Sequence, residues 1–168
     1  MNTLLNRLRK STTVTETDVL SESKFFADKD MIPTPVPALN IALSGRVDGG
    51  LTPGLTTFAG PSKHFKTAFT MILAQSYLKK YPDSVLLFYD SEFGSPQSYF
   101  ESFDIPLDRV LHTPITDIEM LKHDIMVQLE QVKRGDKLII VVDSIGNLAS
   151  KKEVDDALEG KSVADMPR

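Results

Sequence analysis

The sequence predicts an α/β domain in which a mostly parallel sheet is flanked by helices. Three apolar or β-branched stretches of strand length occur at residues 55–59, 85–89 and 138–142, and stretches with helical spacing of apolar residues separate them. This alternation indicates parallel strands joined by right-handed crossovers. In such sheets, ligands bind outside the carboxyl ends of the strands. We therefore expect a functional site where these three strands end.

The composition is that of one globular domain. The chain has 168 residues, of which 41% are apolar and 25% are charged. The net charge of −4 disfavours a chain-wide basic surface for nucleic acid. The absence of cysteine excludes disulfides, thiol catalysis and cysteine-ligated metals. Because the sequence has neither a signal peptide nor an apolar run of membrane-spanning length, we expect a soluble, cytoplasmic protein without a membrane partner.

Residues 1–30 are predicted to form an arm, and residues 31–168 a partial core. Leucines at helical spacing near the N-terminus indicate a short helix, and a Ser/Thr-rich linker follows at residues 11–17. The adjacent pair Phe25 and Phe26 lies in a polar segment. Such a pair anchors an arm either on its own domain or on a neighbouring subunit, and the sequence favours neither.

Helices are expected before and between the strands. Ser95 is the predicted N-cap of the third helix, with proline at its first position. Thr116 and Glu119 have the spacing of a capping box at the start of the fourth. A short apolar piece, Val110-Leu111, lies between these two helices. The expected ranges are 38–43, 67–80, 95 to about 103, and 116–133.

The stretch LTTFAGPSKHFKT, residues 55–67, has the layout of a phosphate-binding loop (P-loop, or Walker A motif). A strand leads into a loop, and the loop opens a helix whose N-terminal N–H groups and dipole favour an anion. Lys66 would neutralise the β- and γ-phosphates of a nucleotide, and the Thr67 hydroxyl would bind Mg²⁺. The alternative is an ordinary helix start after a strand. The predicted loop consists of Gly60, Pro61, Ser62, Lys63, His64, Phe65, Lys66 and Thr67.

Phe65 departs from the motif G-x-x-x-x-G-K-[ST], because it stands where the second glycine belongs. A side chain at this position replaces hydrogen where the backbone passes close to the phosphates. We therefore expect its ring to point outward. The departure predicts altered nucleotide affinity, without loss of the site.

Carboxylates follow the other two strands. Asp143 ends the run Leu-Ile-Ile-Val-Val, and an aspartate in that place organises Mg²⁺ through water. Glu92, two residues after its strand, is a candidate for orienting or deprotonating the attacking water, and Asp90 competes for that role. The alternative for each acid is an ordinary exposed charge. The three histidines show no metal-ligand spacing and are expected to be surface or hydrogen-bonded residues.

Five segments together resemble one family: NIALSG (40–45), FAGPSKHFKT (58–67), LFYDSEFG (87–94), HTP (112–114) and VVDSIGNLASKKE (141–153). From about residue 20 to the last residue, the chain resembles RecA-type recombinases, above all the UvsX recombinases of T4-like bacteriophages. Those proteins also carry a bulky residue before the loop lysine. The resemblance implies a P-loop NTPase with a RecA-like core, an N-terminal arm, and host-cell cytoplasm as the location.

The resemblance also implies ATP and Mg²⁺ as cofactors and a role for each matching residue. Glu92 matches the glutamate that activates water, and Tyr99 the tyrosine that stacks on adenine. Asp143 matches the Mg²⁺-organising aspartate, with Ser144 beside it. Residues 155–164 match the first DNA-binding loop, although their acids outnumber Lys161 and DNA phosphates favour the opposite sign.

The resemblance implies an ATP-dependent recombinase that binds single-stranded DNA as a filament and promotes homologous pairing and strand exchange in recombination and repair. Its arm would dock on the adjacent protomer of the filament. Family members continue well past residue 168, so we expect a truncated, N-terminal portion with weak nucleotide binding and no strand exchange. Two alternatives remain open: a non-catalytic module that docks on or caps recombinase filaments, and a helicase-like motor with the same core.

Overall fold

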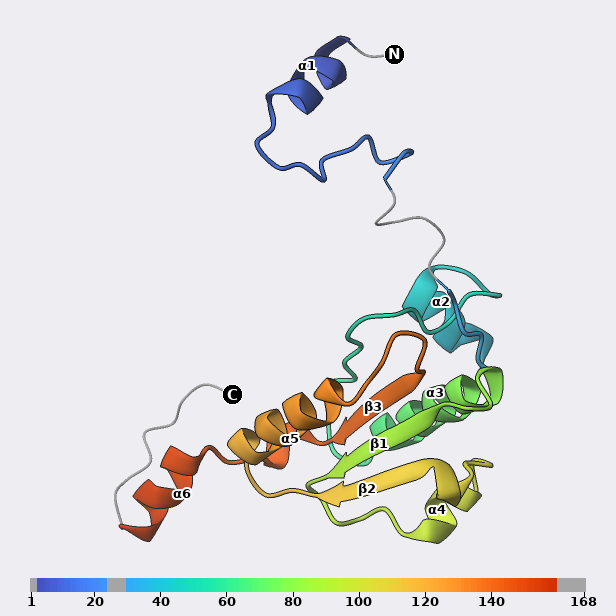
Figure 1. Ribbon diagram of the computed structural model, residues 1–168. Helices are drawn as coiled ribbons and strands as arrows, with labels where there is room; N and C mark the ends of the chain where they lie inside the picture. The colour runs from blue at the N-terminus through green and yellow to red at the C-terminus, as the bar shows by residue number, and fades with distance from the viewer. Residues whose placement is uncertain (1–2, 24–29, 160–168) are drawn as a thin grey trace.

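The computed structural model describes residues 3–23 and 30–159. Three parallel strands form one sheet in the order β2-β1-β3, with α5 over one face and α3 over the other (Figure 1). The α/β architecture with a parallel sheet flanked by helices is therefore confirmed. The helices and strands, in chain order, are α1 (Thr3–Ser11), α2 (Pro37–Ser44), α3 (Lys66–Lys80), β1 (Val85–Asp90), α4 (Gln97–Glu101), the 3₁₀ turn η1 (Leu107–Arg109), β2 (Val110–Pro114), α5 (Ile118–Glu130), β3 (Leu138–Asp143), the 3₁₀ turn η2 (Ile145–Asn147) and α6 (Lys151–Leu158).

The register of the sheet aligns the carboxyl ends of its strands. Asp90, the last residue of β1, lies opposite Pro114 of β2 and Asp143 of β3. β1 is the central strand, and every residue of it after Val85 is buried. Parallel strands that are covered on both faces read as continuous apolar runs, as β1 does.

Two apolar clusters lie on the two faces of β1, because successive side chains of a strand point to opposite sides. Leu86 and Phe88 pack with α3 and with Phe100 of α4. Leu87 and Tyr89 pack on the other face with residues that include Leu121 of α5. The short helix α4, with the turn that follows it, thus belongs to the α3 side of the sheet.

The predicted first strand, residues 55–59, is wrong. These residues have no strand structure, and the Leu55 side chain is 95% exposed. Strand propensity reflects how well side chains pack on a pleated surface. Of these five residues only Phe58 is half-buried, with its ring 6.0 Å from that of Phe69. The third strand of the sheet is instead β2, which extends the apolar piece Val110-Leu111 that the sequence analysis noted.

Two predicted helix starts are also displaced. Helix α4 begins at Gln97, so that Pro96, not Ser95, is its N-cap residue. Helix α5 begins at Ile118 with Asp117 as its N-cap, and the Asp117 side chain accepts a 2.7 Å hydrogen bond from the Met120 N–H. Aspartate suits an N-cap at least as well as threonine, so a cap one residue further along competes successfully.

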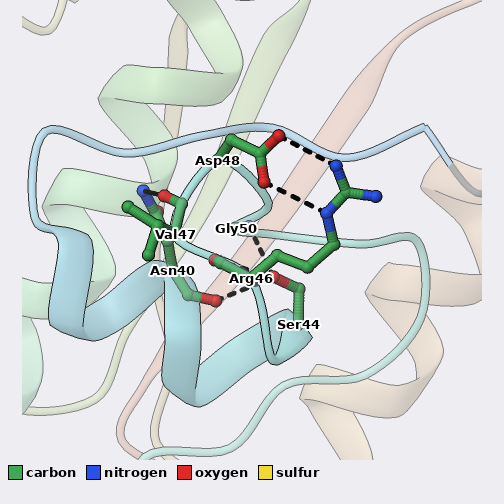
Figure 2. A network of polar contacts seen from close by, with 6 residues as sticks. All are labelled: Asn40, Ser44, Arg46, Val47, Asp48 and Gly50. Carbon is green, nitrogen blue, oxygen red and sulfur yellow. Dashed lines mark hydrogen bonds and ion pairs between the residues drawn. The ribbon is translucent and has the colours of Figure 1, made fainter.

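The segment between α2 and the loop is held by a compact polar network (Figure 2). The buried Asn40 side chain donates to the Val47 carbonyl at 3.0 Å. Ser44 Oγ donates to the Asn40 carbonyl at 2.8 Å and accepts from Gly50 N–H at 2.9 Å. Two hydrogen bonds join Arg46 to Asp48 across the same turn, as Figure 2 shows. This network anchors the backbone that leads toward residue 60.

In the arm, α1 exposes its three leucines, Leu4, Leu5 and Leu8, and Arg9 forms ion pairs with Asp18 and Glu22. The predicted anchor residues Phe25 and Phe26 lie outside the described residues. Within residues 3–23 and 30–159, no helix combines the length and apolarity needed to cross a membrane.

Candidate nucleotide-binding site

The start of α3 meets the end of β3 through one direct contact. Thr67 Oγ1 donates a 2.8 Å hydrogen bond to Asp143 Oδ2, across 76 residues of sequence. Both side chains are half-buried. The two predicted Mg²⁺-binding residues therefore lie side by side, with their oxygen atoms in contact.

The loop before α3 is exposed from Gly60 to Phe65 and contains two strained residues. Lys63 and Phe65 adopt left-handed backbone conformations, with φ of 64° and 59°. Such a conformation costs about 1–3 kcal/mol for a bulky residue. Phe65 is the residue immediately before α3, and its side chain is 73% exposed. Its ring therefore points outward, as expected for a side chain that leaves the inside of the loop free.

Two lysines and a histidine lie on this loop and at the start of α3. Lys66 Nζ donates to the Pro61 carbonyl at 2.9 Å and so lies across the loop. His64 Nδ1 lies 2.8 Å from the Ser62 carbonyl, a contact that keeps the imidazole on the loop as well. With Lys63 beside them, these side chains and the N–H groups at the start of α3 make a favourable place for an anion.

Asp143, at the acidic end of the site, carries a carboxylate whose pKa is affected by burial. Burial raises the pKa of Asp143 above its ordinary value, the hydrogen bond from Thr67 opposes this rise, and the nearby Glu92 and Asp90 carboxylates add to it. A cation bound to Asp143 would relieve this unfavourable charge. The paired hydroxyl and carboxylate oxygens of Thr67 and Asp143 are the hard ligands that Mg²⁺ prefers, so the residues present fit that ion.

The described residues contain no cluster of three or more His, Asp or Glu side chains arranged for a metal ion. Mg²⁺ ordinarily keeps several waters and takes its remaining ligands from substrate phosphates, so Thr67 and Asp143 would supply only part of its coordination.

Glu92 lies at the exposed side of the same edge. Its Oε1 accepts a 3.1 Å hydrogen bond from Ser144 Oγ, which joins the end of β1 to the residue after β3. Asp90, by contrast, is 2% exposed and its carboxylate is turned inward. Of the two acids that competed for a water-activating role, only Glu92 faces solvent.

Tyr99 belongs to α4 and is half-buried, with its ring edge-on to Phe103 at 5.2 Å between centroids. Burial raises its pKa, and the charge of Asp143 adds to this effect. The hydroxyl therefore stays neutral at physiological pH.

Sequence reasoning missed the part that Ser91 and His112 take in the site. Ser91 Oγ donates to the Ser144 carbonyl at 2.7 Å and accepts from the Ser144 N–H at 2.9 Å, so the two strand ends are joined directly. His112 Nε2 lies 3.3 Å from Asp90 Oδ2. The only signal in the sequence was Asp90 at the end of a strand, because an aspartate there often accepts a hydrogen bond from the backbone two residues on. Nothing in the sequence pointed to Ser91 or His112 themselves.

No family model matches the chain. Over all 168 of its residues it is 48% identical to the "Recombination and repair protein" of Enterobacteria phage T4, and it spans 43% of that protein's length. The similarity confirms the resemblance to the recombinases of T4-like bacteriophages that the sequence predicted.

Proposed function

We propose that this chain is the ATP-binding part of an ATP-dependent DNA recombinase with a RecA-like P-loop core. The observation that carries the proposal is the 2.8 Å hydrogen bond between Thr67 and Asp143. It joins the helix start that follows the proposed phosphate loop to the carboxylate that ends β3. The similarity to a phage recombination and repair protein supports the same class of function.

In this proposal the loop from Gly60 to Phe65 binds the phosphates of ATP through its backbone N–H groups. Lys66 leaves the Pro61 carbonyl and pairs with the phosphate oxygens. Thr67 and Asp143 hold Mg²⁺, which when bound neutralises charge on the phosphates. These residues bind and orient the nucleotide and take no part in proton transfer.

Glu92 is the proposed residue that orients or deprotonates the attacking water. Its carboxylate is exposed and is held on one side by Ser144 Oγ at 3.1 Å. Tyr99 is the proposed stacking partner of adenine, because an aromatic ring offers its face to a base. Its edge-on contact with Phe103 fixes the plane of the ring.

For the whole protein, we propose a filament on single-stranded DNA that promotes homologous pairing and strand exchange. The exposed leucines of α1 suit an arm that docks on a neighbouring protomer. The start of the proposed DNA loop, residues 155–158, lies in α6 and is rich in acids. Affinity for DNA phosphates would therefore come from basic residues elsewhere in the protein.

Calorimetric titration of the 168-residue chain with Mg-ATP tests the proposal. The variants are Lys66→Ala and a matched control, Lys79→Ala, which removes an equal charge at the far end of α3. We expect saturable binding in the wild-type chain and the control, and affinity at least about tenfold lower in Lys66→Ala, since one lost charge-assisted contact is worth about 1.4 kcal/mol or more. Equal affinity in all three chains, or no binding by the wild type, would refute it.

A further inference from the structure

Asp90 is a buried carboxylate that the proposed chemistry leaves unused. It is the last residue of β1, and only 2% of its surface is exposed. A carboxylate is costly to bury unless hydrogen bonds satisfy it. In the described part of the chain, no buried side-chain nitrogen or oxygen lacks a hydrogen-bond partner. The partners of Asp90 therefore indicate what it does.

One oxygen of Asp90 holds the backbone of the next residues. Asp90 Oδ1 accepts hydrogen bonds from the N–H of Glu92 at 3.0 Å and from the N–H of Phe93 at 2.7 Å. The chain therefore turns around this single oxygen atom. The turn places Glu92 at the exposed edge of the sheet.

The turn is strained, and its strain explains why it needs such support. Phe93 has a left-handed φ of 52°, and its side chain is 63% exposed. A bulky residue adopts this conformation only where surrounding contacts hold it. The hydrogen bond from the Phe93 N–H to Asp90 is such a contact.

The other oxygen of Asp90 is held by the neighbouring strand. His112 Nε2 lies 3.3 Å from Asp90 Oδ2. His112 is on β2 opposite Phe88, and its ring stacks on the Phe88 ring at 5.9 Å with an angle of 26°. Because Phe88 is fully buried, it fixes the plane of the imidazole. The ring in turn fixes the orientation of the Asp90 carboxylate.

We infer that Asp90 and His112 are positioning residues for Glu92. The inference rests on the proposed function, since Glu92 has a role only if the chain uses ATP. Asp90 holds the Glu92 backbone from inside the sheet, while Ser144 holds the Glu92 carboxylate from the β3 side. Neither Asp90 nor His112 is among the groups proposed to bind phosphate or Mg²⁺. Weakening them should therefore lower the rate of hydrolysis without lowering nucleotide affinity.

The test compares two substitutions of Asp90 in the 168-residue chain. Asp90→Ala removes both oxygens, whereas Asp90→Asn keeps an oxygen that accepts from the two N–H groups. Amide hydrogen exchange, resolved by residue with NMR, reports the turn whether or not the chain binds nucleotide. Single-turnover ATP hydrolysis and Mg-ADP affinity report the chemical step and the binding step separately.

We expect the Glu92 and Phe93 amides to exchange at least about tenfold faster in Asp90→Ala. This is the loss of protection expected when an amide loses its hydrogen bond to a charged acceptor. The Leu86 amide, in the same strand, should be unaffected. Asp90→Asn should restore protection to both turn amides. Where the wild type hydrolyses ATP, the rate in Asp90→Ala should fall about tenfold relative to Asp90→Asn, which has lost the same charge near Asp143, and the two variants should have equal Mg-ADP affinity.

The inference is overturned if the two turn amides exchange at the wild-type rate in Asp90→Ala. It is also overturned if Mg-ADP affinity and the rate of hydrolysis fall by the same factor. If Asp90→Ala fails to fold, His112→Ala decides: faster exchange at Phe93 with Leu86 still protected supports the inference, and unchanged exchange refutes it. A wild-type chain that binds no Mg-ATP refutes the proposed function instead, and amide exchange still decides whether Asp90 holds the turn.

Discussion

Arg109 is predicted to contribute more to stability than its place in a short turn suggests. Its guanidinium lies at the C-terminal end of α3, where carbonyl groups have no partner within the helix. Arg109 Nη1 donates to the Pro82 carbonyl at 2.5 Å and to the Leu78 and Tyr81 carbonyls at 3.2 Å each. Nη2 adds a second bond to Leu78, also at 3.2 Å.

The magnitude follows from these contacts. A hydrogen bond to a charged donor contributes about 1.5–3 kcal/mol, but here one half-buried side chain shares its donors among four carbonyls, the fourth being that of Ser84 at 3.5 Å. A cation at a helix C-terminus adds about 0.3–1 kcal/mol. We therefore expect Arg109→Ala to lower the free energy of unfolding by about 2–4 kcal/mol. Arg109→Lys keeps the positive charge but loses the planar set of guanidinium N–H donors. It should therefore lower the free energy of unfolding by about half as much.

Urea denaturation followed by circular dichroism measures both variants. With a slope of about 2 kcal/mol per molar urea, the middle of the usual range, the midpoint of Arg109→Ala should fall by roughly 1–2 M, with Arg109→Lys between it and the wild type. Mg-ATP affinity of the folded fraction should not change, because Lys66 and Thr67 lie at the opposite end of α3. Midpoints within the error of the wild type for both variants would show that these carbonyls are equally well satisfied by water.

Three further predictions concern the fold. Gly50→Ala should destabilise the chain far more than its control Gly54→Ala: both glycines have positive φ, but a Cβ at Gly50 would lie 2.1 Å from a backbone carbonyl oxygen and one at Gly54 meets nothing within 4 Å. Thermal unfolding distinguishes them, and an equal loss of stability in the two variants would contradict the predicted clash. Asp117→Ala should lower the free energy of unfolding by about 1 kcal/mol in urea denaturation, because it removes the α5 cap, whereas Thr116→Ala should lower it by less than about 0.5 kcal/mol. The reverse order would show that Thr116 is the N-cap, as the sequence predicted. Burial raises the pKa of Tyr89, with its bond to a carboxylate on α5 as the second cause. The stability that this tyrosine contributes should therefore be full below its ordinary pKa of 10.0 and lost as pH rises above it. Alkaline denaturation measures this loss, and the free energy of unfolding of Tyr89→Phe should fall less over the same pH range.

The sequence identified the elements whose signal is local and strong. Helix α3 was predicted because apolar residues recur at helical spacing and two lysines close it, and its packed face then confirms the pattern. The strand at residues 85–89 was predicted because a continuous apolar run of that length requires cover on both faces, and β1 has that cover. Where burial and propensity agree, local sequence is sufficient.

Elements that depend on a neighbour were predicted less well. Residues 55–59 have strand-like composition, yet strand structure requires a partner for the backbone and a surface for the side chains, and Leu55 is left in solvent. The reverse holds for β2, whose exposed Leu111 and His112 hide its strand character. β2 is a strand because its backbone pairs with that of β1.

The candidate site divides in the same way. The sequence alone determined which residue types stand at the loop, at the start of α3 and at the ends of the strands, because the proposed phosphate and Mg²⁺ chemistry restricts those types. Only the tertiary structure brought Thr67 against Asp143 and turned Asp90 inward while leaving Glu92 exposed. Sequence spacing cannot decide between two acids two residues apart, since that choice depends on which one the neighbouring strands surround. Burial of Asp90 between the ends of β2 and β3 is a property of the assembled sheet, and it leaves Glu92 as the proposed water-activating residue.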